Sequence, residues 1–244
     1  MYSHLVDMEP VLRKAMNENE FQLYLQPQFD FDHQQLCGFE ALIRWQHPER
    51  GLLSPVEFLP YIDQLGLSAE LDDWVLNEAA NILMHWKRLF GMCWPIAVNL
   101  SAPQFQHFQL IEKMERLQQE FGIEPEWLEL EITENVAMSD LHNGMSVIQR
   151  LREMGYGIAI DDFGTGHSSL AYLRSLPINK IKIDRSFISE LQHSNNDVTI
   201  LKAMIRLAHG LGKRVIAEGI ETGEQQDILQ KLGCDMMQGY FYSP

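Results

Sequence analysis

The segment YGIAIDDFGTGHSS, residues 156–169, joins an apolar, β-branched run to two adjacent carboxylates and a glycine-containing loop. The run predicts a buried strand. Neighbouring side chains of a regular strand point to opposite faces, so Asp161 and Asp162 can serve one site only where the strand is ending and its backbone turns. A carboxylate pair at such an edge suits two divalent cations. A turn-forming pair followed by a helix cap is the alternative, because Asp and Gly are ordinary turn residues.

The length of 244 residues suits either one (β/α)8 barrel, which takes roughly 250 residues, or two small domains. Hydrophobic residues make up 45% of the chain, and no linker-like stretch divides it, which favours one domain. No long apolar run or signal-like segment occurs, so we expect no membrane contact by this segment. Three scattered cysteines suit a reducing compartment. The expected location is therefore the cytoplasm, including the cytoplasmic side of a membrane-anchored protein.

The net charge of −15 is strongly acidic. It would repel a nucleic-acid polymer, and no basic patch offsets it, so we expect no partner of that kind. The negative charge does not exclude binding of a small anionic ligand, because bound divalent cations can invert the local electric field. Surplus surface acid that favours solubility is the simpler explanation for most of the excess.

Alternating apolar segments predict the order of the elements. Eight of them predict strands: residues 21–29, 36–45, 95–101, 127–133, 156–162, 178–184, 214–221 and 235–242. The short turn after the first strand predicts an antiparallel pair, since a parallel crossover needs about a dozen residues or more. Helices are then predicted between the strands, two of them with capping boxes at 54–57 and 222–225. This alternation favours a closed TIM-like α/β barrel over an open doubly wound sheet.

Residues 1–20 precede the first predicted strand. Apolar residues recur at helical spacing between Leu5 and Met16, which predicts an amphipathic helix. Such a helix either docks on its own barrel or forms the end of a signalling helix from an upstream domain. We expect a lead-in helix over 1–20 and a barrel over 21–244.

Polar side chains interrupt the predicted strands at positions that a barrel would bring together. They are Glu40, Asn99, Glu131, Asp161, Asp162, Lys182, Glu218 and Gln238. From the third strand onward each lies near the carboxyl end of its strand, which is the rim where barrel active sites form. A single residue of this kind usually caps a helix or meets water, but convergence from seven strands favours a site.

The residue types at this rim indicate the chemistry. The carboxylates and the Asn99 amide are oxygen donors, which suit Mg²⁺ or Mn²⁺ and fit Zn²⁺ poorly. Two such ions are the usual apparatus for attack of water on a phosphodiester. Lys182 could hold, orient and help deprotonate that water, and a salt-bridged structural lysine is the alternative.

Seven motifs together resemble the EAL domain, the bacterial cyclic-di-GMP phosphodiesterase family. They are EALIRWQHP (40–48), VNLS (98–101), ELEITE (129–134), DDFGTGHSSL (161–170), KIDRSF (182–187), AEGIET (217–222) and QGYFYSP (238–244). The resemblance runs from about Phe21 to Pro244, and its motifs are long and in order. It implies a modified (β/α)8 barrel with an antiparallel first strand pair. It also implies two Mg²⁺ or Mn²⁺ ions and hydrolysis of cyclic di-GMP to linear pGpG.

The resemblance further implies a role for each matching residue. One metal would be held by Glu40, Asn99, Glu131 and Asp161, and a second by Asp161, Asp162 and Glu218. Lys182 matches the water-activating residue and Gln238 a residue that orients the water or its ligands. Glu134 matches the glutamate that steadies the loop after Asp162, which in this family couples metal binding to dimer contacts. Substrate contacts are expected from Arg44, Asp184, Glu221, Gln26 and Leu42.

The metal and water positions of an active family member are all filled. His167 departs from the family, which usually has Tyr or Phe there, and a tolerated substitution is the simpler interpretation. We therefore expect a phosphodiesterase, with a non-catalytic cyclic-di-GMP binding module and a barrel enzyme acting on another phosphoester as alternatives. By resemblance we also expect a homodimer, an upstream sensor or GGDEF domain in a longer protein, and inhibition by Ca²⁺, since Mg²⁺ prefers a tighter octahedral site.

Overall fold

In the computed structural model, described for residues 2–105, 109–139, 141–165, 170–191 and 195–243, nine strands form one sheet. The strands are β1 (Phe21–Asp30), β2 (Leu36–His47), β3 (Gly51–Leu53), β4 (Ile96–Asn99), β5 (Leu128–Thr133), β6 (Gly157–Phe163), β7 (Lys180–Ile183), β8 (Arg214–Ala217) and β9 (Met236–Met237). Their order is β1-β9-β8-β7-β6-β5-β4-β2-β3, and a further pairing of β1 with β2 closes the barrel. The predicted TIM-like barrel is confirmed.

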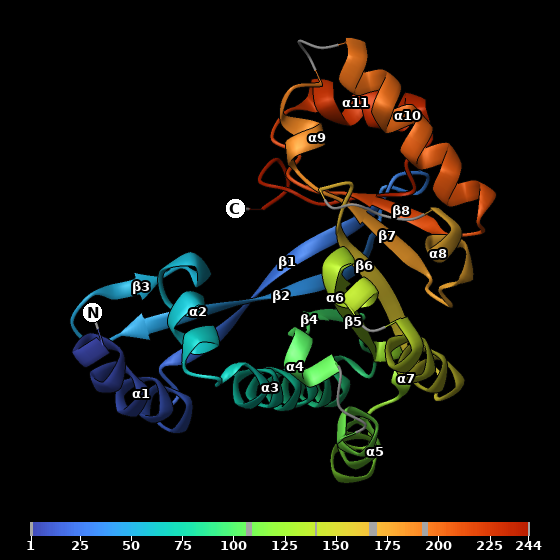
Figure 1. Cartoon of the computed structure of the whole chain (residues 1–244). Helices are drawn as coiled ribbons and strands as arrows, with labels where there is room; N and C mark the ends of the chain where they lie inside the picture. The colour runs from blue at the N-terminus through green and yellow to red at the C-terminus, as the bar shows by residue number, and fades with distance from the viewer. Residues whose placement is uncertain (1, 106–108, 140, 166–169, 192–194, 244) are drawn as a thin grey trace.

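Helices connect the strands around the outside of the barrel (Figure 1). They are α1 (Tyr2–Asn17), α2 (Pro55–Gln64), α3 (Ser68–Phe90), α4 (Ala102–Phe105), α5 (Gln109–Phe121), α6 (Glu134–Ser139), α7 (Leu141–Glu153), α8 (Leu170–Ser175), α9 (Ser186–Ser189), α10 (Asn195–Gly210) and α11 (Gly223–Leu232), with a 3-10 turn at Pro125–Trp127. Both predicted capping boxes form, at the starts of α2 and α11. In the described part of the chain, no helix is both long and apolar enough to cross a bilayer.

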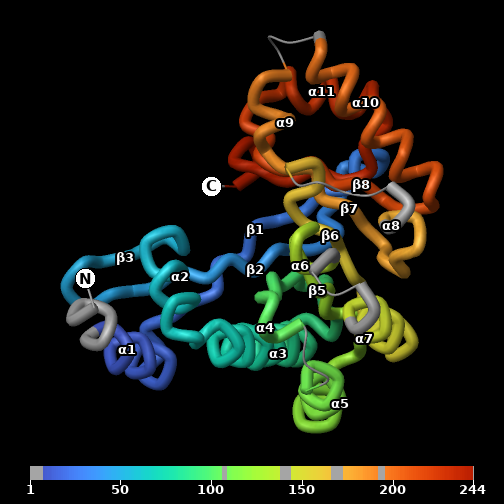
Figure 2. Tube along the Cα trace, in the orientation of Figure 1, coloured from blue at the N-terminus to red at the C-terminus, as the bar shows by residue number. Residues whose placement is uncertain are grey.

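Strand β1 is antiparallel to both of its neighbours, β2 and β9, whereas β2 runs parallel to β4. The antiparallel first pair is therefore as predicted from the short turn. This pair is longer than the other strands, and it extends out of the barrel to β3, α1 and α2 (Figures 1 and 2).

The protruding end of the hairpin has its own core. Leu12 of α1, Phe21, Trp45 and Phe58 are buried there, and three pairs among the aromatic rings have centroids 5.3–5.9 Å apart. Burial of each such side chain stabilises the fold by roughly 1.5–3 kcal/mol. Helix α1 thus packs against its own hairpin and α2.

The structure corrects the ends of two predicted strands. The strand expected over 214–221 ends at Ala217, and the one expected over 235–242 is only Met236–Met237. The chain turns after both of them, and Gly239 packs so closely on Ile220 that a Cβ would lie 2.2 Å from its backbone. Short β3, α6 and α9 were not predicted, and His167 lies outside the described residues.

Candidate functional site

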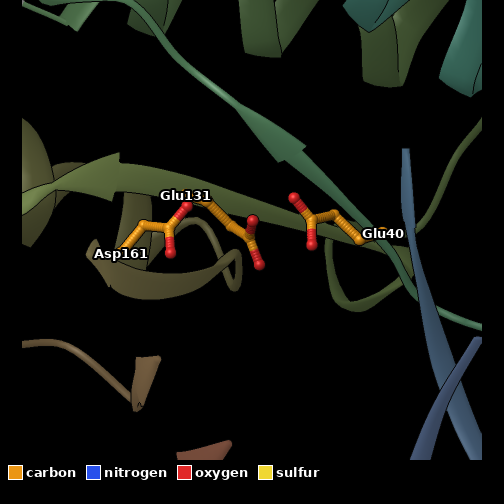
Figure 3. A group of neighbouring side chains, drawn as sticks. All are labelled: Glu40, Glu131 and Asp161. Carbon is orange, nitrogen blue, oxygen red and sulfur yellow. The ribbon is translucent and has the colours of Figure 1, made fainter. Parts of the chain in front are cut away.

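A single buried lysine lies among four carboxylates at the carboxyl end of the barrel strands. The Nζ atom of Lys182 is 2.6 Å from Glu131, 2.7 Å from Glu218, 3.2 Å from Glu40 and 3.3 Å from Asp161. Its side chain is fully buried. Figure 3 shows the carboxylates of Asp161 and Glu40 extending from either side toward that of Glu131. The predicted convergence of strand-end acids and Lys182 is what the structure shows.

The register of the sheet explains why these groups meet. Asn99 lies beside Glu131 in the β4–β5 ladder, and Thr133 lies beside Asp161 in the β5–β6 ladder. Alternate residues of each strand point into the barrel, so Glu131 and Asp161 share the interior with Lys182 of β7. Glu218 follows directly after β8, where the chain leaves the sheet.

The charges at this site are far from balanced. Burial raises the pKa of Glu131 well above its usual value, although Lys182 opposes the shift. Burial alone would lower the pKa of Lys182, but the surrounding carboxylates, led by Glu131, hold it well above its usual value. Burial also raises the pKa of Glu218 to about 8. The single positive charge of Lys182 does not neutralise the four carboxylates around it.

The excess of acid fits a divalent cation. One carboxylate oxygen from each of Glu40, Glu131 and Asp161 lies within 4.8 Å of the other two. Among the described residues, Glu131 Oε1 is buried and has no hydrogen-bond partner, which is a costly state for a carboxylate oxygen. Hard cations such as Mg²⁺ take several oxygen ligands of this kind. The donor set therefore fits a divalent cation.

Asp162 reaches the site because the backbone of β6 is irregular there. Its φ of +55° is in the left-handed region, and the β6–β7 ladder shifts register between Ile160 and Phe163. The Asp162 amide donates to Asp161 Oδ1 at 2.8 Å. Burial, followed by the charge of Asp161, raises the pKa of Asp162. Strand β6 extends to Phe163, and the change in backbone direction that lets both Asp161 and Asp162 face one site occurs at Asp162, inside the strand.

Amide groups hold the two oxygens of Glu40. Asn99 Nδ2 donates to Oε1 at 2.9 Å, and Gln238 Nε2 donates to Oε2 at 2.6 Å. Burial alone would raise the pKa of Glu40, but Lys182 and these two donors outweigh it, so the pKa is lowered. Glu40 therefore stays ionised and keeps a defined orientation.

Glu134, the first residue of α6, is buried beneath the loop that follows β6. Its Oε2 accepts a hydrogen bond of 3.1 Å from the Gly164 amide. Its Oε1 has no partner among the described residues. Glu134 thus contacts the loop after β6, and in the described part of the chain it is not among the carboxylates that pair with Lys182.

A cleft of about 510 Å³ opens above the acids. Four of the predicted substrate contacts line it: Gln26, Leu42, Asp184 and Glu221. Arg44 does not. Its Nη1 donates to the Ile43 carbonyl at 2.9 Å, and its guanidinium lies 5.7 Å from the centroid of the Tyr24 ring. The phosphate contact expected from Arg44 stays a prediction.

A second cavity, of about 430 Å³, adjoins the first and shares Leu42 with it. Its walls are mostly apolar residues of β2, α2 and α3, and two carboxylates, Asp63 and Asp72, face it. Burial raises the pKa of Asp72 to about 6, and Asp72 accepts a hydrogen bond of 2.8 Å from the Ser101 amide. Sequence reasoning missed this cavity because its carboxylates lie on helices rather than at strand ends.

Comparison with known proteins agrees with this geometry. The family model of the EAL domain matches residues 10–244. The chain belongs to the EAL domain family. The bifunctional diguanylate cyclase/cyclic di-GMP phosphodiesterase MucR of Pseudomonas aeruginosa is 42% identical over 229 residues, which cover 94% of this chain and 33% of MucR. Cyclic di-GMP phosphodiesterase NbdA of the same organism is 37% identical, over 98% of this chain and 30% of its own length.

Solved EAL structures have the same fold. A PaMucR phosphodiesterase in complex with c-di-GMP matches with a TM-score of 0.92 and 40% identity, over 99% of this chain and 96% of that one. The FimX EAL domain from Pseudomonas aeruginosa bound to c-di-GMP matches with a TM-score of 0.87 and 26% identity, over 96% and 94%. The chain spans about a third of the length of the curated relatives it matches.

Proposed function

We propose that this EAL domain hydrolyses one phosphodiester bond of cyclic di-GMP to give linear pGpG, with two divalent cations, Mg²⁺ or Mn²⁺, held by the acids at the barrel rim. The observation that carries the proposal is the group of four carboxylates around Lys182 with an unpartnered, buried Glu131 Oε1. The relatives MucR and NbdA are named as cyclic di-GMP phosphodiesterases, and EAL domains are known in complex with c-di-GMP, which supports the choice of substrate.

The residues divide into those that would hold each cation. Glu40, Asn99, Glu131 and Asp161 would hold one, and Asp161, Asp162 and Glu218 the other. Bound cations of this type lower the pKa of a ligated water and stabilise the charge that develops on the phosphoryl oxygens. Asn99 Nδ2 donates a hydrogen bond to Glu40, so the amide oxygen of Asn99 would be the atom that binds the cation.

Lys182 and Gln238 would position the attacking water. In the reaction the water oxygen forms a bond to phosphorus, the bond from phosphorus to the ribose O3′ breaks in line, and O3′ takes up a proton. Lys182 lies among the carboxylates of Glu131, Asp161 and Glu218, where its ammonium can donate to that water. Gln238 holds Glu40 in place through Oε2.

The two adjoining cavities would take the two guanine bases. Leu42 lines both of them, and apolar wall residues suit the faces of a purine ring. The N1–H and N2–H donors of guanine need carboxylate or carbonyl acceptors, which Asp184 and Glu221 offer in one cavity and Asp63 in the other. The phosphodiester between the bases would then lie over the acids.

The proposal is tested by incubating the purified protein with cyclic di-GMP, with and without Mg²⁺ or Mn²⁺, and separating the products by chromatography. We expect metal-dependent formation of pGpG that disappears in Glu40→Ala and in Asp161→Ala, while both variants still unfold cooperatively. Activity retained in both variants would contradict the metal assignment. Binding of cyclic di-GMP without turnover would instead indicate a receptor, and equal rates on generic phosphodiesters would indicate a different substrate.

A further inference from the structure

We propose that Gln28, a buried residue of β1, is a positioning residue that acts on the site through Gln238. Gln28 Nε2 donates to Gln238 Oε1 at 3.0 Å, and Gln238 Nε2 in turn donates to Glu40 Oε2 at 2.6 Å. Gln28 thus helps to hold the end of the Gln238 amide that faces Glu40 in place. This inference rests on the proposed function for its effect on turnover, but its effect on metal binding does not depend on the substrate.

The local fold places Gln28 inside the barrel. Gln26 and Gln28 are two residues apart on β1, so both point to its interior face. Gln28 is 2% exposed, and a bulge between Gln28 and Phe29 interrupts the β1–β2 ladder. Bulges of this kind re-aim a side chain next to a site. Gly38 lies opposite Gln28, and a Cβ there would approach Gln28 Oε1 to 3.5 Å and the Pro95 carbonyl to 3.1 Å, so the glycine leaves room for the amide.

The Gln238 amide has a partner at every position. Its Nε2 donates to Gln26 Oε1 at 2.8 Å as well as to Glu40, and its Oε1 accepts from Gln28. Gln26 is itself fixed, because its Nε2 donates to the Ser243 carbonyl at 3.1 Å. An amide has two N–H donors and one carbonyl oxygen, so this network uses the group fully. The orientation therefore does not depend on a single contact.

Loss of the Gln28 donor would leave Gln238 Oε1 buried and unpaired. A buried amide oxygen without a partner costs about 1–3 kcal/mol, so the Gln238 side chain is held less firmly in its present position. A shift of Gln238 toward other donors would lengthen the hydrogen bond from its Nε2 to Glu40 Oε2. Glu40 Oε2 would then be held less firmly, whereas Oε1 keeps its Asn99 donor. A carboxylate held loosely at one oxygen is less ordered as a cation ligand.

The test compares Gln28→Met, which keeps the length of the side chain and removes the donor, with the unchanged protein. We expect Gln28→Met to weaken binding of Mn²⁺ alone, measured by calorimetry without nucleotide, by about 10-fold, which is the usual effect of losing an outer-shell partner. We expect kcat for cyclic di-GMP to fall by a similar factor while KM stays within about 2-fold. Gln28 also lines a cavity of about 280 Å³ at the other end of the barrel, which gives the new side chain room.

A second comparison separates positioning from general destabilisation. In a Gln238→Leu background, Gln28→Met should produce no further loss of Mn²⁺ affinity or kcat, because its only route to Glu40 is already gone. Tyr156→Phe is the matched control, since it also removes one buried hydrogen bond, from the tyrosine hydroxyl to the Met114 carbonyl, away from the site. It should lower stability and leave both readouts unchanged.

Additive effects of Gln28→Met and Gln238→Leu would overturn the proposal, as would unchanged Mn²⁺ affinity in Gln28→Met. If Gln28→Met does not fold, Gln28→Asn serves the same purpose, because its amide falls one methylene short of Gln238. If the unchanged protein does not hydrolyse cyclic di-GMP, the proposed function fails, whereas the Mn²⁺ measurements still decide the role of Gln28.

Discussion

Two lysine–glutamate pairs cross the interior of this barrel one layer apart, and they differ in what surrounds them. Lys180 and Glu129 meet at 2.8 Å near the amino ends of the strands, and Lys182 and Glu131 meet at 2.6 Å near the carboxyl ends. Both pairs join β7 to β5 across β6. Both layers therefore consist of one glutamate of β5 and one lysine of β7. The upper pair lies two residues further along each strand than the lower pair.

The lower pair is balanced. Among the described residues, Lys180 pairs with one carboxylate, that of Glu129, and both side chains are largely buried, at 11% and 14% exposure. Gly157 on the intervening β6 makes the contact possible, because a Cβ there would lie 3.2 Å from Glu129 Oε2. One cation and one anion that satisfy each other need no further ligand.

The upper pair is not balanced. Lys182 shares its charge with Glu40, Asp161 and Glu218 in addition to Glu131. Buried carboxylates that outnumber their cations are costly unless protons or metal ions make up the difference. The comparison shows that the surplus of acid, rather than the buried ion pair itself, marks the functional end of the barrel.

The largest difference is expected in turnover, from the same substitution in each layer. Glu131→Gln removes a proposed cation ligand and should lower kcat by about 1,000-fold, which corresponds to about 4 kcal/mol. Glu129→Gln removes the equivalent charge from the balanced pair and should leave kcat per folded molecule within about 3-fold. Initial rates with Mn²⁺ measure both, with the folded fraction taken from unfolding curves. Similar losses in the two variants would show that the layers do not differ in function.

The next difference is expected in stability. Lys180→Met leaves Glu129 buried without its cation, and breaking one partner of a buried pair costs about 3 kcal/mol or more. Urea unfolding at neutral pH should show this loss, and the double variant Lys180→Met/Glu129→Gln should recover part of it because no charge is then left unpaired. Failure of the double variant to recover any stability would mean that lost packing, not the unpaired charge, is the cause.

The smallest effect is expected in the pH dependence of the metal-free protein. The pKa of Glu218 is raised by burial from its ordinary 4.5 to about 8. Between these values the folded protein holds more protons than the unfolded chain, so its stability decreases as pH rises from 4.5 to 8. We expect urea unfolding of the chelator-treated protein to show this decrease in the free energy of unfolding.

Two comparisons show whether Glu218 is the cause. Glu218→Gln should flatten the decrease, and saturating Mn²⁺ should abolish it because the bound ions keep the carboxylates ionised. Stability that rises with pH over this interval in the metal-free protein would contradict the raised pKa of Glu218.

Much of the fold and of the acidic site is predictable from the sequence because both follow from local patterns. Strand period and strand-end position are enough to place Glu131, Asp161 and Lys182 on one rim. The capping boxes at Ser54 and Thr222 are likewise local, and both form as predicted. Predictions were less successful where packing decides the outcome. The last two strands end early because the chain turns where Gly219 packs on Arg185 and Gly239 packs on Ile220, and neither contact has a signal within its own segment.

By itself the sequence determined the alternation of strands and helices, the antiparallel first pair and the types of group that meet at the barrel rim. Only the tertiary structure decided that Lys182 lies among four carboxylates while Lys180 has one, that Arg44 turns to Tyr24, and that Gln28 reaches Gln238. The physical reason is the difference in range. Periodicity and turn chemistry act over a few residues, whereas the partner of a buried polar group is set by strands that lie far apart in the chain and meet only when the barrel closes.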